Sequence, residues 1–147
     1  CSRGRPHSYK YIDLPLFPGY LFCRFNARLR LPVLVTPGVI QVVGSGKTPV
    51  PIDDHEIEAI QRIVASQLAA EPWSYLRAGQ SIMIAAGPLQ GVAGILLSAK
   101  RRTRLVVSVE LLRRSVAVEI DREWVSPLPP LHSRSTTSVQ AFVARAA

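Results

Sequence analysis

The residues best suited to catalysis are few in this sequence of 147 residues, and they lie far apart. General acid or base chemistry near neutral pH most often uses histidine, and the three histidines are scattered along the chain, at His7, His55 and His132. No phosphate-binding loop, Ser/His/Asp order or metal-ligand spacing accompanies them. We therefore expect a protein that is not an enzyme, with no catalytic residue, no metal and no cofactor.

The acidic cluster Asp53, Asp54 and Glu56 is better explained by helix formation than by chemistry. Asp53 is a suitable N-cap, and Glu56 follows it at the spacing of a capping box. Carboxylates in the first turn also complement the helix dipole. Apolar residues then recur at helical spacing over residues 57–68, which predicts a helix over residues 53–70.

An aromatic strand is the strongest candidate for a binding function. The stretch PLFPGYLFCRF predicts a strand over residues 19–25 that places Tyr20, Phe22 and Arg24 on one face. The opposite face suits a core and carries Leu21, Cys23 and Phe25. Aromatic side chains concentrate at interface hot spots. From the residues alone, core packing of Tyr20 and Phe22 is favoured over binding, and Phe17 fits either role.

The composition favours a globular protein with an acidic partner. Apolar residues make up 48% of the chain, and the net charge of +8 suits a partner such as nucleic acid. Cys1 and Cys23 form no disulfide or zinc pattern, which fits a cytoplasmic location. No apolar run approaches the roughly 20 residues of a membrane span, and no signal-peptide pattern opens the chain, so we expect no membrane association.

The remaining patterns divide the chain into two units. A short helix is predicted at residues 32–35 and a strand at residues 39–43. Residues 71–78 break the helical pattern and predict a linker, which Trp73 and Tyr75 would hold partly packed.

The second unit has a different periodicity. From Gly79 onward, apolar residues alternate in four or five short segments, which predicts a small β-barrel over residues 79–127. Residues 128–147 are rich in Pro, Ser and Thr and predict a disordered tail with at most one marginal helical turn.

Two stretches, in this order, carry a resemblance to a known family. PLFPGYLFCRF, followed by TPGVIQVVG and TPVPIDDHEIEAI, resembles the later part of the N-terminal (NGN) domain of NusG-family transcription elongation factors, including their RfaH-like paralogues. AAGPLQGVAGIL and RLVVSVELLRRSVAVEID resemble the KOW domain that follows it. The resemblance implies an α+β NGN-type domain over residues 1–70, a linker at 71–78 and an SH3-like, all-β KOW barrel at 79–127. The strand-helix-strand that opens the family's NGN domain is absent, so we expect a truncated domain in which the strand over residues 19–25 lacks a neighbour.

The resemblance also implies a function for the first unit. The family's NGN domain docks on the clamp helices of the largest RNA polymerase subunit, and the protein acts in elongation, antitermination or termination, here as an expected monomer. Aromatic residues of the matching segment make that contact, and the corresponding residues here are Phe17, Tyr20 and Phe22. Arg28 and Arg30 are candidates to face the polymerase gate loop or the nontemplate DNA.

The second unit resembles a module that recruits partners. Gly87, Gly91 and Gly94 frame the KOW turn, and at Gly94 we expect that a Cβ would clash or force an unfavourable φ. In the family, an exposed apolar loop tip contacts termination factor Rho or a small-subunit ribosomal protein, and Leu89 and Val92 are the matching residues. The alternative is that this loop folds back onto the barrel.

The basic residues leave alternatives open. The run KRRTR, residues 100–104, with Arg113 and Arg114, is either a phosphate-contacting patch or the solvated turn that such runs more often form. Arg113 also stands where many NusG sequences have glycine, which leaves the geometry of its turn open. A KOW-type RNA-binding or ribosome-associated protein is the second hypothesis, and a binding module lipidated at Cys1 is the third.

Overall fold

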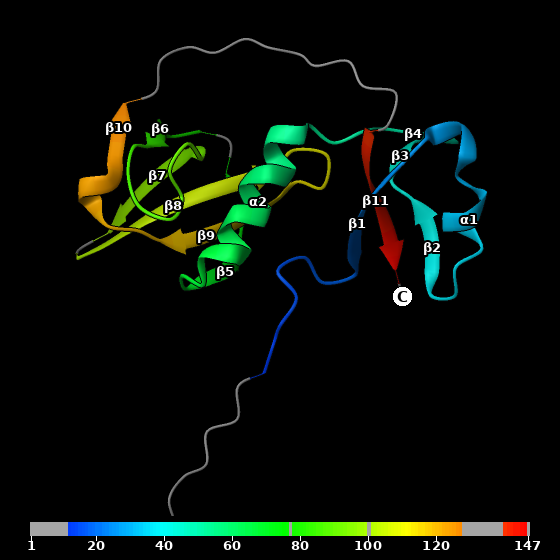
Figure 1. Ribbon diagram of the computed structural model, residues 1–147, viewed down its shortest axis with the longest axis horizontal. Coiled ribbons are helices and arrows are strands. Elements are labelled where there is room, and N and C mark those ends of the chain that lie inside the picture. The colour runs from blue at the N-terminus through cyan, green and yellow to red at the C-terminus, as the bar shows by residue number, and fades with distance from the viewer. Residues whose placement is uncertain (1–11, 77, 100, 128–139, 147) are drawn as a thin grey trace, which may run out of the picture.

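The computed structural model describes residues 12–76, 78–99, 101–127 and 140–146, which form two larger β-sheets with a long helix between them and a separate two-stranded sheet (Figure 1). The first half contains β1 Tyr20–Phe25, the 3-10 helix η1 Ala27–Leu29, α1 Leu31–Leu34, β2 Val39–Val42, β3 Gly44–Ser45, β4 Thr48–Pro49 and α2 Asp54–Ser66. The second half contains β5 Ala70–Trp73, β6 Gln80–Ile84, β7 Ala93–Ala99, β8 Arg102–Val109, β9 Arg114–Glu119, the 3-10 helix η2 Arg122–Trp124, β10 Val125–Pro127 and β11 Gln140–Ala146.

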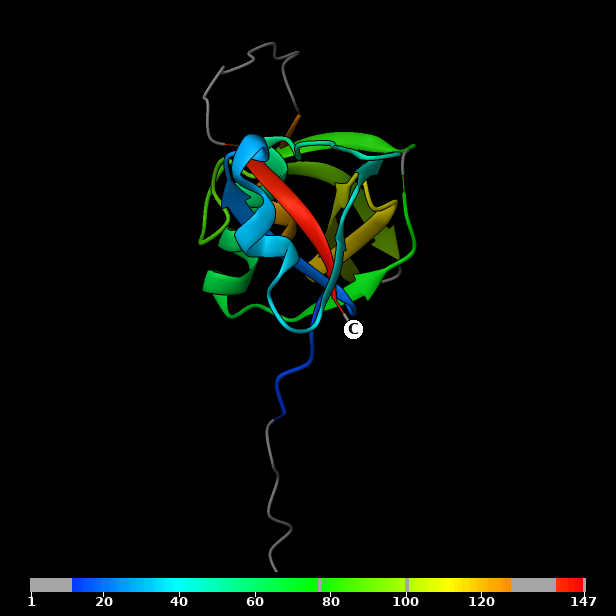
Figure 2. The ribbon, with the colours of Figure 1, turned by 90° about the vertical axis from the view of Figure 1, so that its right-hand side faces the viewer.

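The first sheet has the order β1-β11-β2, so its central strand comes from the C-terminal part of the chain. β11 runs antiparallel to both neighbours and lies between them in the view of Figure 2, where it is red. The short helix α1 and the strand β2 agree with the predicted elements, and β3 and β4 form a separate hairpin.

β11 corrects two expectations. The segment from Gln140 to Ala146, expected to be disordered with one helical turn, is a strand whose residues Ala141 to Ala144 are all buried. It also provides β1 with the neighbour that the sequence did not offer it. The expectation of disorder was wrong because it followed the Pro, Ser and Thr content of residues 128–147, whereas both faces of this strand are covered. Residues 128–139 of the expected tail lie outside the described residues.

The second sheet has the order β10-β6-β7-β8-β9-β5. β6 to β9 match the predicted alternating segments, and each pairs antiparallel with the next. Residues Ala70 to Trp73, largely within the expected linker, form β5 and pair with β9, so this part of the chain belongs to the sheet. Across the described strands, no pairing joins β5 to β10, so hydrogen bonding does not close the expected barrel. The content is mostly β with few helices, which is compatible with an α+β unit followed by a β-barrel.

α2 lies between the two sheets and contacts both β8 and β11 (Figure 1). It begins as predicted, because the Asp53 carboxylate accepts a hydrogen bond of 2.8 Å from the His55 N–H. It ends earlier than predicted, at Ser66, because Gln67 adopts a left-handed conformation with φ of 57°. Ile57, Ile60 and Ile63 are buried in one hydrophobic cluster that includes residues of both sheets.

Gly94 occupies a position where a side chain does not fit. A Cβ built on it would lie 2.6 Å from the Val106 carbonyl oxygen and 2.8 Å from Leu105 Cδ1, which confirms the expected clash. Gly87 and Gly91 have φ of 85° and 86°, and these values explain glycine in the turn.

We predict that Gly94→Ala destabilises the protein by about 1–3 kcal/mol, because the added methyl group overpacks the β7–β8 contact. Thermal unfolding followed by circular dichroism measures the change. Ala93→Gly, at the neighbouring exposed residue, is the matched control for altering this strand. A Gly94→Ala variant as stable as the parent would contradict the close approach of β7 and β8.

Candidate functional site

The aromatic residues near β1 form a connected group against the core. Phe17 is buried, with 5% of its surface exposed, and its ring meets that of Phe22 edge-to-face at 5.2 Å. Tyr20 and Phe22 are half-buried and pack against the hydrophobic cluster. Of the three predicted binding residues, Phe17 is therefore a core residue in this structure, and only Tyr20 and Phe22 retain exposed surface.

The two faces of β1 differ from the sequence-based assignment. Leu21, expected to face a core, is 55% exposed. Phe25, on the same face, does pack, with its ring 4.7 Å from that of Phe142. The assignment was wrong for Leu21 because the main cluster of buried residues lies on the Tyr20 and Phe22 side of the strand.

Tyr20 connects the two halves of the chain. The Arg114 guanidinium, at the start of β9, lies over the Tyr20 ring at 5.4 Å from its centroid. Such a cation–π contact contributes about 0.5–1 kcal/mol at an exposed site. Sequence reasoning did not identify this pairing, because no local pattern relates residues so far apart.

The region that follows β1 is basic and apolar. Arg28 is exposed in η1, and Arg30 donates a hydrogen bond of 3.1 Å to the Lys47 carbonyl oxygen. The same stretch of sequence contains exposed apolar side chains, at Leu29, Leu31, Leu34, Val35 and Ile40. Arg24 is bound elsewhere, because it forms a 2.7 Å salt bridge with Asp54 at the start of α2.

Leu89 and Val92 do not form an exposed tip. Their exposed fractions are 0% and 3%, and both belong to the hydrophobic cluster. Arg62 of α2 donates a hydrogen bond to the Gln90 carbonyl oxygen between them. The loop therefore folds back onto the protein, which is the alternative that the sequence left open. The helix α2 holds it there through the hydrogen bond from Arg62.

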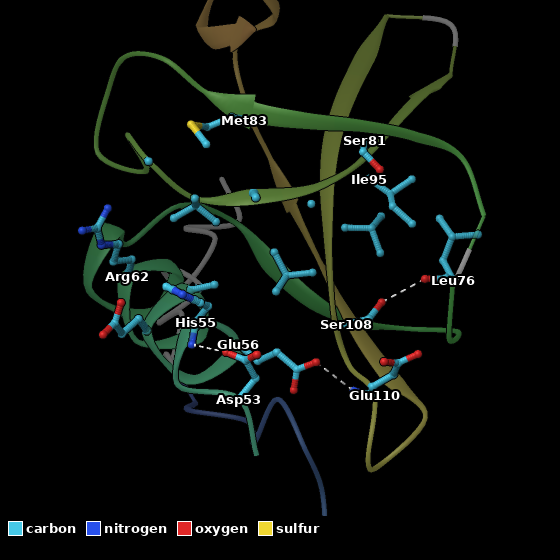
Figure 3. Close-up of a pocket in the computed structure, with 18 of the residues that line it drawn as sticks. Asp53, His55, Glu56, Arg62, Leu76, Ser81, Met83, Ile95, Ser108 and Glu110 are labelled. Carbon is cyan, nitrogen blue, oxygen red and sulfur yellow. Dashed lines mark hydrogen bonds between the residues drawn. The ribbon is translucent and has the colours of Figure 1, made fainter. Parts of the chain in front are cut away.

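A pocket of about 650 Å³ lies between α2 and the strands β6 to β8 (Figure 3). Its α2 side presents acidic and basic groups, and its sheet side is mainly apolar. Glu56 accepts a 3.3 Å hydrogen bond from the Glu110 N–H, and the Ser108 hydroxyl donates 3.0 Å to the Leu76 carbonyl oxygen. In the described part of the chain, no group of three or more His, Cys, Asp or Glu side chains could hold a metal ion.

Burial raises the pKa of Glu56, and the nearby carboxylates of Asp53 and Glu110 raise it further, against the lowering effect of the Glu110 N–H bond. A raised pKa in the folded state means that the contribution of Glu56 to stability falls as the pH rises through that pKa. We predict that Glu56→Gln, which keeps an oxygen acceptor, is more stable relative to the parent at pH 7 than at pH 4. Urea unfolding at both pH values measures this, with Glu58→Gln at an exposed position as control. An equal stability difference at the two pH values would contradict the role of burial.

The basic hairpin is largely engaged within the protein. Arg102 forms a 3.2 Å salt bridge with Glu119, and Arg104 forms one of 2.9 Å with Glu71 while lying 5.0 Å from the centroid of Trp73. These contacts favour a surface turn over a patch reserved for phosphate. Lys100, part of the predicted run, lies outside the described residues.

The backbone conformation of Arg113 shows the geometry of its turn. Arg113 adopts φ of 49°, a left-handed conformation that glycine would adopt without strain, so the turn keeps this geometry with an arginine. Its guanidinium lies 5.8 Å from the centroid of the Tyr75 ring.

Comparisons with known proteins agree with the family resemblance. A family model described as transcription termination factor nusG matches residues 2–61. A transcription termination/antitermination protein NusG from Borreliella burgdorferi is 26% identical over 125 residues, covering 77% of this chain and 68% of the relative. Proteins of the same name from Thermus thermophilus and Campylobacter jejuni are each 27% identical, and the matches cover 72% and 76% of this chain.

The matched part spans about two thirds of the length of these relatives, at 68%, 64% and 64%. No solved structure matches this chain significantly. The family match and the relatives together show that this chain is similar to NusG proteins, which carry names for transcription termination and antitermination. Within the described residues, every helix is too short or too polar to cross a membrane.

Proposed function

We propose that this chain is a transcription elongation or antitermination factor that binds RNA polymerase through the surface around β1. The matches to NusG proteins carry this proposal. It extends to an NGN-type domain in the first half, which docks on the clamp helices of the largest polymerase subunit, and a KOW-type domain at residues 79–127. Its activity is binding rather than catalysis, and its location is that of the polymerase, the cytoplasm.

Two residues of β1 support a contact at this surface. Tyr20 and Phe22 are half-buried on an edge strand, so each residue retains some surface for a partner. Aromatic rings provide a large contact area with few rotatable bonds, which favours tight binding. Phe17 supports the surface from beneath, because its ring packs edge-to-face on Phe22.

Arg28 and Arg30 are proposed to lie toward the nontemplate DNA or the gate loop. They follow β1 directly and contribute to the net charge of +8, which favours a nucleic acid nearby.

Recruitment of a partner such as Rho or a ribosomal protein through residues 79–127 is part of the proposal. Because Leu89 and Val92 are buried, such a partner would first meet the exposed residues beside them, Pro88 and Gln90.

We predict that Tyr20→Ala weakens polymerase binding by about 2 kcal/mol, roughly thirtyfold in Kd, because it removes an aromatic contact. Tyr75→Ala is the matched control, since Tyr75 is also half-buried and also lies beneath an arginine, but in the second half of the chain. Titration of labelled protein with RNA polymerase gives the affinities, and circular dichroism establishes that both variants are folded.

Equal affinities of Tyr20→Ala and the parent would remove β1 from the binding surface. Salt-sensitive binding of RNA without binding of polymerase would instead favour the RNA-binding alternative. A fall in melting temperature that accounts for the whole loss of binding would assign Tyr20 to core packing.

A further inference from the structure

The first sheet contains a slot for one extended strand, because its two outer strands do not pair with each other. β1 pairs with β11 from Tyr20 to Phe25, and β2 pairs with the opposite edge of β11. If β11 left, both β1 and β2 would expose an unpaired backbone edge toward the same gap. Exposed strand edges of this kind are templates for pairing with another extended segment.

Backbone hydrogen bonds hold β11 on both edges. The Val43 N–H donates to the Val143 carbonyl oxygen at 2.7 Å, and the Ile52 N–H donates to the Ala141 carbonyl oxygen at 2.8 Å. On the other edge, the Ala146 N–H donates to the Gly19 carbonyl oxygen at 2.9 Å. Main-chain bonds of this type provide affinity for any extended segment, so side chains must provide the selectivity.

The side chains of β11 define what the slot accepts. Ala141, Val143 and Ala144 have exposed fractions of 3% or less, which leaves room only for small or β-branched residues at these positions. Phe142 is 1% exposed and its ring packs on Phe25, so this position accepts an aromatic ring. Gln140 and Arg145 are exposed and impose little selection.

Among the described strands, no backbone ladder joins β11 to the second sheet, and only its side chains reach the shared hydrophobic cluster. Its ladder partners within the described residues are β1 and β2, with an isolated bridge from Ala141 to Ile52. β10 ends at Pro127, and residues 128–139 join it to β11 in sequence. No described ladder of β5 to β10 includes a residue of β11.

We propose that the gap between β1 and β2 is a peptide-binding site, occupied here by the chain's own residues 140–146 as a detachable strand. Its ligand class is an extended peptide that pairs antiparallel to both edges and carries the pattern small, aromatic, β-branched, small. The proposal does not depend on the proposed role in transcription, because it rests on strand order, hydrogen bonds and burial alone.

The test uses the full chain with a specific protease site introduced within residues 128–139. After cleavage, the C-terminal fragment is expected to co-elute with the rest of the protein in gel filtration. Excess fluorescent peptide with the sequence of residues 138–147 is then expected to replace it, as fluorescence anisotropy reports. The same peptide with Val143→Asp is the control, and we expect it to bind at least about tenfold more weakly, because the slot would bury its charge.

Two results would overturn the proposal. In the first, the C-terminal fragment separates from the rest of the protein after cleavage, and the hydrogen-exchange rates of the β1 and β2 backbone amides do not change. In the other, the cleaved protein binds the native and Val143→Asp peptides equally. If the fragment is retained and a second copy of the chain then replaces it, the result also supports this site. That copy supplies the same strand, residues 140–146.

Discussion

Replacing Phe142 with alanine should lower the free energy of unfolding by about 3–5 kcal/mol, the usual cost of removing a buried aromatic side chain. Phe142 is 1% exposed, its ring packs 4.7 Å from that of Phe25, and its strand is the centre of the first sheet. The substitution therefore removes a contact and leaves a cavity beside the one strand that joins β1 to β2. Urea unfolding followed by circular dichroism measures the change.

Gln140→Ala is the matched control for Phe142→Ala. Gln140 lies on the same strand and pairs with Phe25 in the ladder, but its side chain is exposed. Its substitution should change the stability by no more than about 0.5 kcal/mol. If Phe142→Ala were as mild as this control, residues 140–146 would not be part of the core, and the expected disordered tail would be the better description.

Leu89→Ala should be the second strongly destabilising substitution, with a loss of about 2–5 kcal/mol. Leu89 has no exposed surface and belongs to the hydrophobic cluster that α2 shares with both sheets. The neighbouring backbone is fixed as well, because Arg62 donates to the Gln90 carbonyl oxygen. Removing the side chain leaves a cavity that the loop cannot easily close.

Gln90→Ala separates this effect from a general effect on the loop. Its side chain is exposed, and the backbone carbonyl that Arg62 uses remains in the variant. We expect Gln90→Ala to be near neutral in the same unfolding experiment. A Leu89→Ala variant with unchanged stability but weaker binding of a partner protein would contradict the burial of Leu89. It would favour the exposed loop tip that the family resemblance implies.

Elements with strong local signals could be predicted from the sequence. The start of α2 was predictable because an N-cap acts within one turn, and Asp53 bonds the His55 N–H as such a residue should. β6 to β9 were predictable because a strand with one buried face shows a period of two. Gly94 was predictable because of its place in the turn of a recognised family pattern.

Contacts between distant segments could not be predicted in this way. The sequence of β11 alternates only weakly, because both of its faces are covered, and the Pro, Ser and Thr before it favour disorder on composition. The sequence of β1 does not reveal which of its faces lies toward the main cluster, so Leu21 was assigned to a core. For Leu89, the family resemblance implied an exposed tip and a folded-back loop was the alternative, and nothing in the loop itself indicates that α2 packs against it.

Binding of RNA polymerase by the full chain tests the central claim most directly. Purified, fluorescently labelled protein is titrated with core RNA polymerase from the same organism, and with the same enzyme assembled without the clamp helices of its largest subunit. We predict saturable binding to the complete enzyme, weakened roughly thirtyfold by Tyr20→Ala, and loss of that binding when the clamp helices are absent. Equal binding of the two enzymes, or no binding of either by a folded chain, would contradict the proposed function.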